Sequence, residues 1–197
     1  MEIIAHRINT LAGLMQVPRS FGVEIDLRDH GNRLILQHEP FSDGEDAEPF
    51  FQAYRHGTLI LNIKSERIEI RILELLRKYQ IPRFFFLDSS FPMIYLLAKE
   101  GESNLALRFS EFEGLDTILK MAGLVKWVWV DCFTRLPIDR QSFDLLKKAG
   151  FLLCMVSPEL QGQADKIQSY RHFLESEAVF FDAVCTKLPN APCWQSP

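Results

Sequence analysis

The chain has 197 residues, of which 47% are hydrophobic and 24% are charged, and its formal net charge is −4. This length and composition predict a single domain, residues 1–197, with enough apolar residues for a substantial core. The negative charge argues against nucleic-acid binding, and no apolar run reaches the roughly 18 residues that a transmembrane helix needs.

The cysteines favour a reducing compartment. Cys132, Cys154, Cys185 and Cys193 are widely spaced and form no CxxC pair. The first three lie in apolar runs, which predicts buried, reduced thiols and argues against a zinc site. The N-terminus also lacks the basic and apolar segments of a signal peptide, so we expect a cytoplasmic protein.

The best-defined pattern near the start of the chain is the stretch Gly22–Glu39. Apolar and polar residues alternate from Gly22 to Arg28, the period of a β-strand. The DHGN sequence at residues 29–32 predicts a tight turn, after which the chain returns to His38. A short strand over residues 3–5 precedes this stretch and ends at His6. The hairpin therefore brings the carboxylates of Glu24 and Asp26, and the imidazole of His38, towards His6.

Beyond His38, apolar runs alternate with amphipathic helical patterns. Ser65 and Asp139 are expected to be the N-caps of two of these helices. The runs that predict further strands cover residues 59–64, 83–88, 105–110, 126–131, 151–156 and 179–185.

Apolar strands separated by amphipathic helices indicate a parallel sheet covered by helices. The eight predicted strand–helix units favour an α/β fold, a compact (β/α)8 TIM barrel, and an open doubly wound sheet is the alternative. No glycine-rich phosphate loop follows any predicted strand, so nucleotide-binding folds of that kind have no support.

Polar side chains recur at the carboxyl ends of the predicted strands, where barrel enzymes hold their active sites. Buried charge is costly unless it is paired, so this convergence predicts either a functional site or a salt-bridge network. Trp129 is predicted to line the substrate pocket, although tryptophans also fill barrel interiors. The residues concerned are His6, Glu24, Asp26, His38, Asn62, Lys64, Asp88, Arg108, Ser110, Glu111 and Asp131.

Three short motifs in order resemble the HR…ExD…HD signature of glycerophosphodiester phosphodiesterases. They are His6-Arg7, Glu24-x-Asp26 and His38-Glu39. The run LILNIK falls where that family has a strand ending in Glu-x-Lys, and FDAVCTKLPN resembles its closing strand. The similarity thus covers both ends of the chain, whereas the middle matches only in strand order.

The resemblance implies a barrel enzyme that cleaves a small phosphodiester with the help of a divalent cation, Mg²⁺ or Ca²⁺. A substrate hydroxyl next to the phosphate would attack phosphorus, and water would open the cyclic intermediate. One imidazole would accept a proton and the other would donate one. The roles implied are acid–base catalysis for His6 and His38, metal binding for Glu24, Asp26 and Asn62, and phosphate binding for Arg7 and Lys64. Arg108 and Trp129 are further candidates for phosphate or substrate binding because of their places on the predicted strands.

The chain also departs from the family pattern. Ile8 follows His-Arg where the family has glycine, and Asn62 replaces the third metal carboxylate. An asparagine oxygen can bind Mg²⁺ or Ca²⁺ but brings no charge, so we expect weaker metal binding. Two other functions therefore stay open. One is a barrel that has lost metal binding and acts as a binding or regulatory protein. The other is a sugar-phosphate isomerase or aldolase that uses Lys64 as proton shuttle or Schiff-base amine.

Overall fold

The structure is a computed structural model and describes residues 1–195. The chain divides into two compact units: an N-terminal unit, Ile4–Leu96, and a C-terminal unit, Leu97–Pro197 with Met1–Ile3. The elements, in chain order, are β1 (Glu2–Ala5), α1 (Leu11–Leu14), β2 (Gly22–His30), β3 (Arg33–Leu36), β4 (Glu45–Asp46), α2 (Ala47–Ala53), β5 (Leu59–Ile63), α3 (Glu69–Lys78), β6 (Phe84–Leu87), α4 (Phe91–Lys99), β7 (Ala106–Phe109), α5 (Leu115–Lys120), β8 (Trp127–Val130), α6 (Arg140–Lys148), β9 (Leu152–Val156), η1 (Pro158–Gln161), η2 (Ala164–Lys166), α7 (Ile167–Ser176), β10 (Ala183–Thr186) and η3 (Leu188–Trp194).

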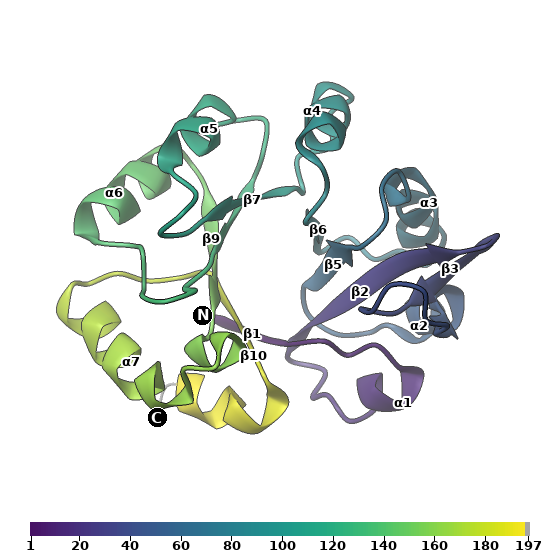
Figure 1. Cartoon of the computed structure of the whole chain (residues 1–197), viewed down its shortest axis with the longest axis horizontal. Helices are drawn as coiled ribbons and strands as arrows, with labels where there is room; N and C mark the ends of the chain where they lie inside the picture. Colours follow the sequence, from purple (N-terminus) through teal and green to yellow (C-terminus); the bar gives the residue numbers. More distant parts are fainter. Residues whose placement is uncertain (196–197) are drawn as a thin grey trace. The chain divides into compact units, whose positions relative to one another are not determined.

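The N-terminal unit is built around β2. Strand β5 pairs with β2 in parallel and β6 pairs with β5 in parallel, while the second half of β1 pairs with the start of β2. The far half of β2 forms an antiparallel hairpin with β3, and β4 extends it. Helix α2 packs on β3 and contacts both α1 and α3 (Figure 1). The sheet of this unit is therefore mixed, because the hairpin adds antiparallel strands to the parallel ones.

Gly22 allows three backbone segments to meet at the start of β2. A Cβ atom at this position would lie 2.2 Å from Ile4 Cδ1 and 2.4 Å from the Thr58 carbonyl oxygen. That carbonyl accepts the backbone N–H of Val23 at 2.9 Å. The missing side chain thus sets the spacing of β1, β2 and the start of β5, the strands that carry the candidate site.

The C-terminal unit contains a parallel sheet in the order β10, β9, β8, β7. The Glu2 N–H donates to the Asp182 carbonyl oxygen at 2.8 Å, which fixes the first residues of β1 to this unit. Helix α6 begins with a capping box in which Asp139 and Ser142 bond each other's backbone. The segment η3 packs against α7 and β10.

The predicted alternation of strands and helices is confirmed in both units. All eight predicted strands are present, and the hairpin is longer than predicted because β2 continues to His30. The cap prediction for Asp139 is confirmed. The cap prediction for Ser65 is wrong: α3 begins later, after Ile68, and the Ser65 hydroxyl instead accepts the N–H of Asp29.

A closed eight-stranded barrel is not confirmed. The pairing in the N-terminal unit runs from β4 to β6 and that in the C-terminal unit ends at β7. Closure, like the single domain over residues 1–197, stays a prediction, and residues 196–197 lie outside the described part of the chain. Within residues 1–195, no helix is long and apolar enough to cross a membrane. Cys132, Cys154 and Cys185 are buried thiols outside any disulfide, as predicted, and the cytoplasmic location remains a prediction.

Candidate active site

The loop after β1 binds directly to Glu24 of β2. Arg7 has a left-handed backbone, with φ of 55°, and its N–H donates to Glu24 Oε2 at 2.6 Å. The same oxygen lies 3.8 Å from His6 Nε2. A non-glycine residue in this conformation is held by its surroundings, and such residues concentrate at functional sites. The loop therefore places an imidazole beside a carboxylate.

Glu24 is buried, with 1% of its surface exposed, and its other oxygen accepts a hydrogen bond from Asn62 Nδ2 at 2.9 Å. Burial, together with the negative charge of Asp26, raises the pKa of Glu24 to about 7. The hydrogen bonds from Asn62 and from the Arg7 backbone act in the opposite direction. Burial dominates because a charged carboxylate loses its hydration there.

Asp26 is the second buried carboxylate and lies two residues further along the same face of β2. Its Oδ2 accepts a hydrogen bond from Asn9 Nδ2 at 2.8 Å and lies 3.6 Å from Arg7 Nε. Its Oδ1 lies 3.6 Å from Lys64 Nζ. Directly across the β2–β5 ladder from Asp26 is Asn62, so register brings the predicted trio together. Asp26 is thus flanked by two cationic side chains.

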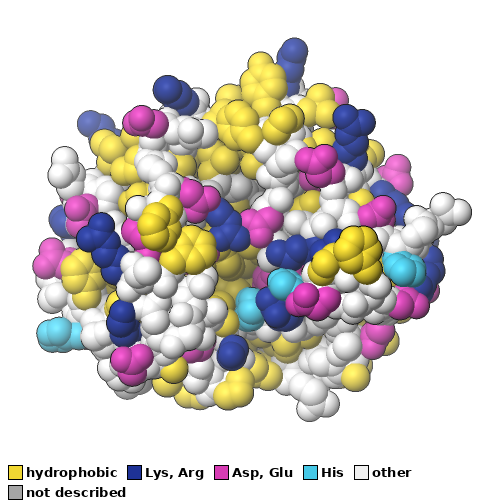
Figure 2. Space-filling model, viewed as in Figure 1, with side chains coloured by type: hydrophobic (Ala, Val, Ile, Leu, Met, Phe, Trp, Pro, Cys, Tyr) yellow, Lys and Arg dark blue, Asp and Glu magenta, His cyan; other side chains and the backbone are white. Residues whose placement is uncertain are grey.

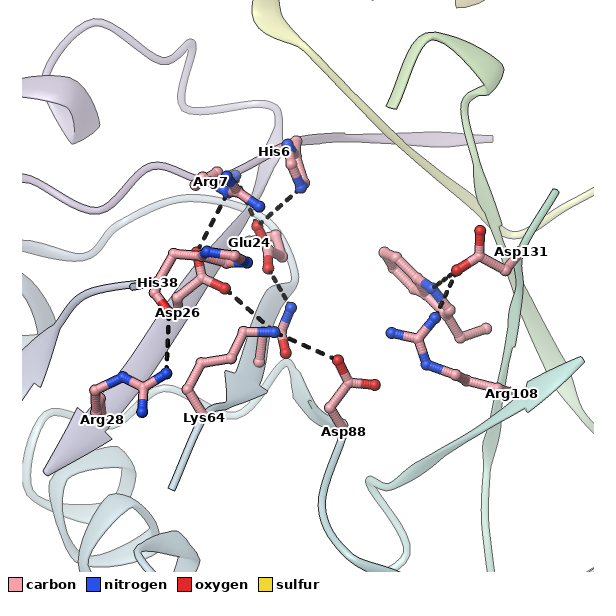
Figure 3. Close-up of polar contacts among 12 residues, drawn as sticks. His6, Arg7, Glu24, Asp26, Arg28, His38, Lys64, Asp88, Arg108 and Asp131 are labelled. Atoms are coloured by element: carbon pink, nitrogen blue, oxygen red, sulfur yellow. Dashed lines mark hydrogen bonds and ion pairs between the residues drawn. The ribbon is translucent and has the colours of Figure 1, made fainter. Parts of the chain in front are cut away.

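Lys64 connects this cluster to the loop after β6. Its ammonium nitrogen lies 3.5 Å from Asp88 Oδ2, and its side chain is 18% exposed. Asp88 is another non-glycine residue with a left-handed backbone, with φ of 62°. Figure 3 shows Lys64 reaching between Asp26 and Asp88. The structure therefore brings together residues from the ends of β5 and β6, as the sequence predicts.

His38 follows β3 and is oriented by its neighbours. Its Nδ1 lies 2.6 Å from Glu39 Oε1, and its carbonyl oxygen accepts a hydrogen bond from Arg28 Nη2 at 3.0 Å. The hydrogen bond to His38 lowers the pKa of Glu39, which keeps this carboxylate ionised. In Figure 3 both imidazole rings, those of His6 and His38, extend towards the Glu24–Asp26 pair.

The cationic and imidazole side chains of the cluster remain open to solvent while its two carboxylates are buried. The exposed fraction is 21% for the side chain of His6, 46% for Arg7 and 34% for His38. The face of the N-terminal unit seen in Figure 2 shows basic, acidic and histidine side chains next to one another. A small anion could therefore reach the cations and both imidazoles without unfolding the site.

The oxygen atoms of the predicted metal ligands are largely taken up by donors of the protein itself. Both Glu24 oxygens accept hydrogen bonds, and so does Asp26 Oδ2. Asp26 Oδ1 and Asn62 Oδ1 are buried without a hydrogen bond, but the former faces the Lys64 ammonium. Within residues 1–195, no group of three or more His, Cys, Asp or Glu side chains is arranged to hold a metal ion. Because Mg²⁺ and Ca²⁺ need several oxygen ligands, the residues as they lie do not fit a divalent cation.

Two predicted substrate contacts, Arg108 and Trp129, lie in the C-terminal unit. Arg108 Nη1 pairs with Asp131 Oδ2 at 2.5 Å (Figure 3), and Trp129 Nε1 donates to the same oxygen at 3.4 Å. Gln161 donates to the other Asp131 oxygen at 2.8 Å. These residues form a local network, and their role in substrate binding stays a prediction.

Sequence reasoning assigned no role to three side chains of the cluster. Asn9 bonds both the side chain and the backbone of Asp26, Glu39 bonds the imidazole of His38, and Arg28 bonds the backbone of His38. Glu39 had a signal in the sequence, because an acidic residue next to a candidate catalytic histidine is an orienting partner. Asn9 had none, because its contact depends on how the loop after β1 folds back.

Comparisons with known proteins support the fold. No protein-family model matches the chain, and no curated protein shows significant similarity to it. Three solved structures match nearly its whole length. A glycerophosphodiester phosphodiesterase from Agrobacterium tumefaciens is 16% identical with a TM-score of 0.62, covering 93% of this chain and 95% of its own.

The second structure is a putative glycerophosphoryl diester phosphodiesterase from the same organism. It is 12% identical with a TM-score of 0.70, covering 98% of this chain and 96% of its own. A glycerophosphoryl diester phosphodiesterase from Parabacteroides distasonis is 13% identical with a TM-score of 0.66, covering 94% of this chain and 82% of its own. The resemblance indicated by the sequence motifs is therefore confirmed at the level of the fold.

Proposed function

We propose that this chain is a phosphoric diester hydrolase of the glycerophosphodiester phosphodiesterase type, acting on a small phosphodiester. The observation that carries the proposal is the cluster around Glu24 and Asp26. It combines two buried carboxylates, two cationic side chains and two imidazoles in one unit, on a fold shared with phosphodiesterases. Fold alone does not define an activity, so the chemistry of this cluster is what supports the proposal.

In the proposed reaction, a hydroxyl of the substrate next to the phosphate attacks phosphorus. One imidazole, His6 or His38, accepts the hydroxyl proton, and the other donates a proton to the departing alkoxide. Water then opens the cyclic phosphate with the two roles reversed. Glu24, 3.8 Å from His6 Nε2, and Glu39, 2.6 Å from His38 Nδ1, support each ring and stabilise it when it is protonated.

Charge on the phosphoryl oxygens is balanced by Arg7 and Lys64 in this proposal. Both cations are partly exposed and held by Asp26, so little reorganisation is needed when an anion binds. The fold family implies a divalent cation that would polarise the phosphoryl group, with Glu24, Asp26 and Asn62 as its ligands. Since the present arrangement of these residues does not fit such an ion, no step is assigned to it.

The isomerase or aldolase alternative has less support. It needs Lys64 as a nucleophilic amine, whereas Lys64 lies 3.6 Å from Asp26 and 3.5 Å from Asp88, an arrangement typical of charge balance.

Phosphorus NMR of the purified chain with glycerophosphocholine tests the proposed function. We expect a phosphomonoester to appear, preceded by the signal of a five-membered cyclic phosphate. The matched control substrate is the analogue that lacks the neighbouring hydroxyl, which should stay intact. Equal turnover of the two diesters would contradict the proposed intramolecular attack, and turnover of neither would contradict the activity.

A further inference from the structure

We infer that the Glu24–Asp26 pair of this chain is closed to Mg²⁺ and Ca²⁺, and that the positive charge met by a phosphoryl group comes from Lys64 and Arg7 instead. The statement about metal binding is independent of the proposed function. The statement that these two cations receive a phosphoryl group rests on it.

The first support is that the carboxylate oxygens are already engaged. Glu24 Oε2 accepts the Arg7 N–H at 2.6 Å, and Glu24 Oε1 accepts Asn62 Nδ2 at 2.9 Å. Asp26 Oδ2 accepts Asn9 Nδ2 at 2.8 Å. These donors are buried or partly buried, and a displaced donor without a new acceptor is costly. A metal ion would have to displace several of them at once.

The second support is the position of Lys64. Its ammonium lies 3.6 Å from Asp26 Oδ1, the carboxylate oxygen that lacks a hydrogen bond, and 3.5 Å from Asp88 Oδ2. The Asp26 oxygen that could still bind a metal ion therefore already faces a cation of the protein. Lys64 is 18% exposed, so the ion pair is only partly screened by water.

The third support is the charge of the ligand set. Asn62 brings an amide to the position across the β2–β5 ladder from Asp26, and its nitrogen faces Glu24. The trio therefore carries one negative charge fewer than three carboxylates would, while Arg7 and Lys64 both lie 3.6 Å from Asp26. A divalent cation would add two positive charges beside two cations, which repel it.

Metal titration of the full chain tests the inference. After treatment with a chelator and dialysis, thermal unfolding is followed with MgCl2, CaCl2 or MnCl2 at about 10 mM, with NaCl of equal ionic strength as the control. A site with a dissociation constant of about 0.1 mM would raise the unfolding midpoint by about 5 °C or more. We expect the wild-type midpoint to change by less than about 1 °C.

A gain-of-binding variant gives the opposite expectation. Asn62→Glu combined with Lys64→Met restores a carboxylate and removes the ammonium, so Mn²⁺ should raise the midpoint of this variant by several degrees. Lys147→Met is the matched control, because Lys147 forms a comparable partly exposed ion pair, 2.9 Å from Asp182, in the C-terminal unit. This control should show no metal-dependent rise.

A metal-dependent rise in the wild type that Glu24→Gln abolishes would overturn the inference. The wild-type titration decides the matter even where the double variant fails to fold. For the second statement, inorganic phosphate should raise the wild-type midpoint but not that of Lys64→Met, and an equal rise in both would overturn it. Loss of the proposed phosphodiesterase activity would leave the metal titration unaffected, so the two proposals fail separately.

Discussion

Asn9 and Asp26 are held together by two hydrogen bonds of 2.8 Å. Asn9 Nδ2 donates to Asp26 Oδ2, and the Asp26 N–H donates to Asn9 Oδ1. This pair fixes the loop that follows β1 onto the middle of β2. His6 and Arg7 lie between the end of β1, which pairs with β2, and Asn9, which is bonded to Asp26. The Asn9–Asp26 pair therefore limits where the side chains of His6 and Arg7 can lie relative to the buried carboxylates.

Replacing Asn9 should therefore destabilise the chain. Asn9→Ala removes the hydrogen bonds of the Asp26 N–H and of one oxygen of its buried carboxylate, which should lower the free energy of unfolding by about 1–3 kcal/mol. Urea unfolding measures this loss. Asn32→Ala, at an exposed position of the β2–β3 turn, is the control and should change stability by less than about 0.5 kcal/mol. Equal effects of the two substitutions would show that the Asn9–Asp26 bonds contribute nothing.

Glu39 is predicted to act as a positioning residue for His38. The exposed carboxylate accepts from His38 Nδ1, which directs the other ring nitrogen away from Glu39. Glu39→Gln should lower kcat, but by less than the roughly 10²-fold loss expected for His38→Ala, because the imidazole is kept while the carboxylate that orients it is lost. A kcat equal to that of the wild type, measured with a phosphodiester substrate, would remove Glu39 from the mechanism.

Stability should depend on pH through Glu24. Because burial raises the pKa of Glu24 to about 7 from 4.5, the folded state binds a proton more tightly than the unfolded state between these values. The stabilisation is present at low pH and is lost as pH rises towards about 7. In chelator-containing buffer, the wild type should lose about 2–3 kcal/mol between about pH 5 and pH 8 relative to Glu24→Gln. Parallel pH dependences of the two proteins would contradict the raised pKa.

Gly22 is predicted to tolerate no side chain. A Cβ atom would lie 2.4 Å from the Thr58 carbonyl oxygen, so Gly22→Ala must separate the strands and should cost about 1–3 kcal/mol. Gly114→Ala is the matched control, because a Cβ atom there meets nothing within 4 Å and the backbone φ is −78°. Chemical denaturation of the two variants compares them. A Gly22→Ala variant as stable as Gly114→Ala would show that this junction is loosely packed.

Strand–helix alternation could be predicted because burial enforces it locally. The LILNIK run became β5, and its register with β2 places Asn62 opposite Asp26. Asp139 was recognisable as a cap because its own side chain makes the cap. The Ser65 prediction failed because the same side chain met a tertiary partner, the N–H of Asp29, which overrode the local preference.

The residues of the candidate site could be predicted from the sequence, but the contacts between their side chains could not. Alternation placed Glu24 and Asp26 on one face of a strand, and a motif placed His6 and His38 nearby. The sequence does not specify that the Asn62 nitrogen turns to Glu24, or that Asp88 and Asp26 share Lys64. Those contacts depend on the register between strands and on left-handed backbone at Arg7 and Asp88, which no local pattern encodes.

The acid–base pair of His6 and His38 is the central claim, and steady-state hydrolysis of glycerophosphocholine by single histidine variants tests it most directly. His6→Ala and His38→Ala should each lower kcat by about 10²–10⁴-fold with unfolding midpoints close to that of the wild type. His30→Ala, at the exposed end of β2, should keep full activity. Full activity in both His6→Ala and His38→Ala would contradict the claim.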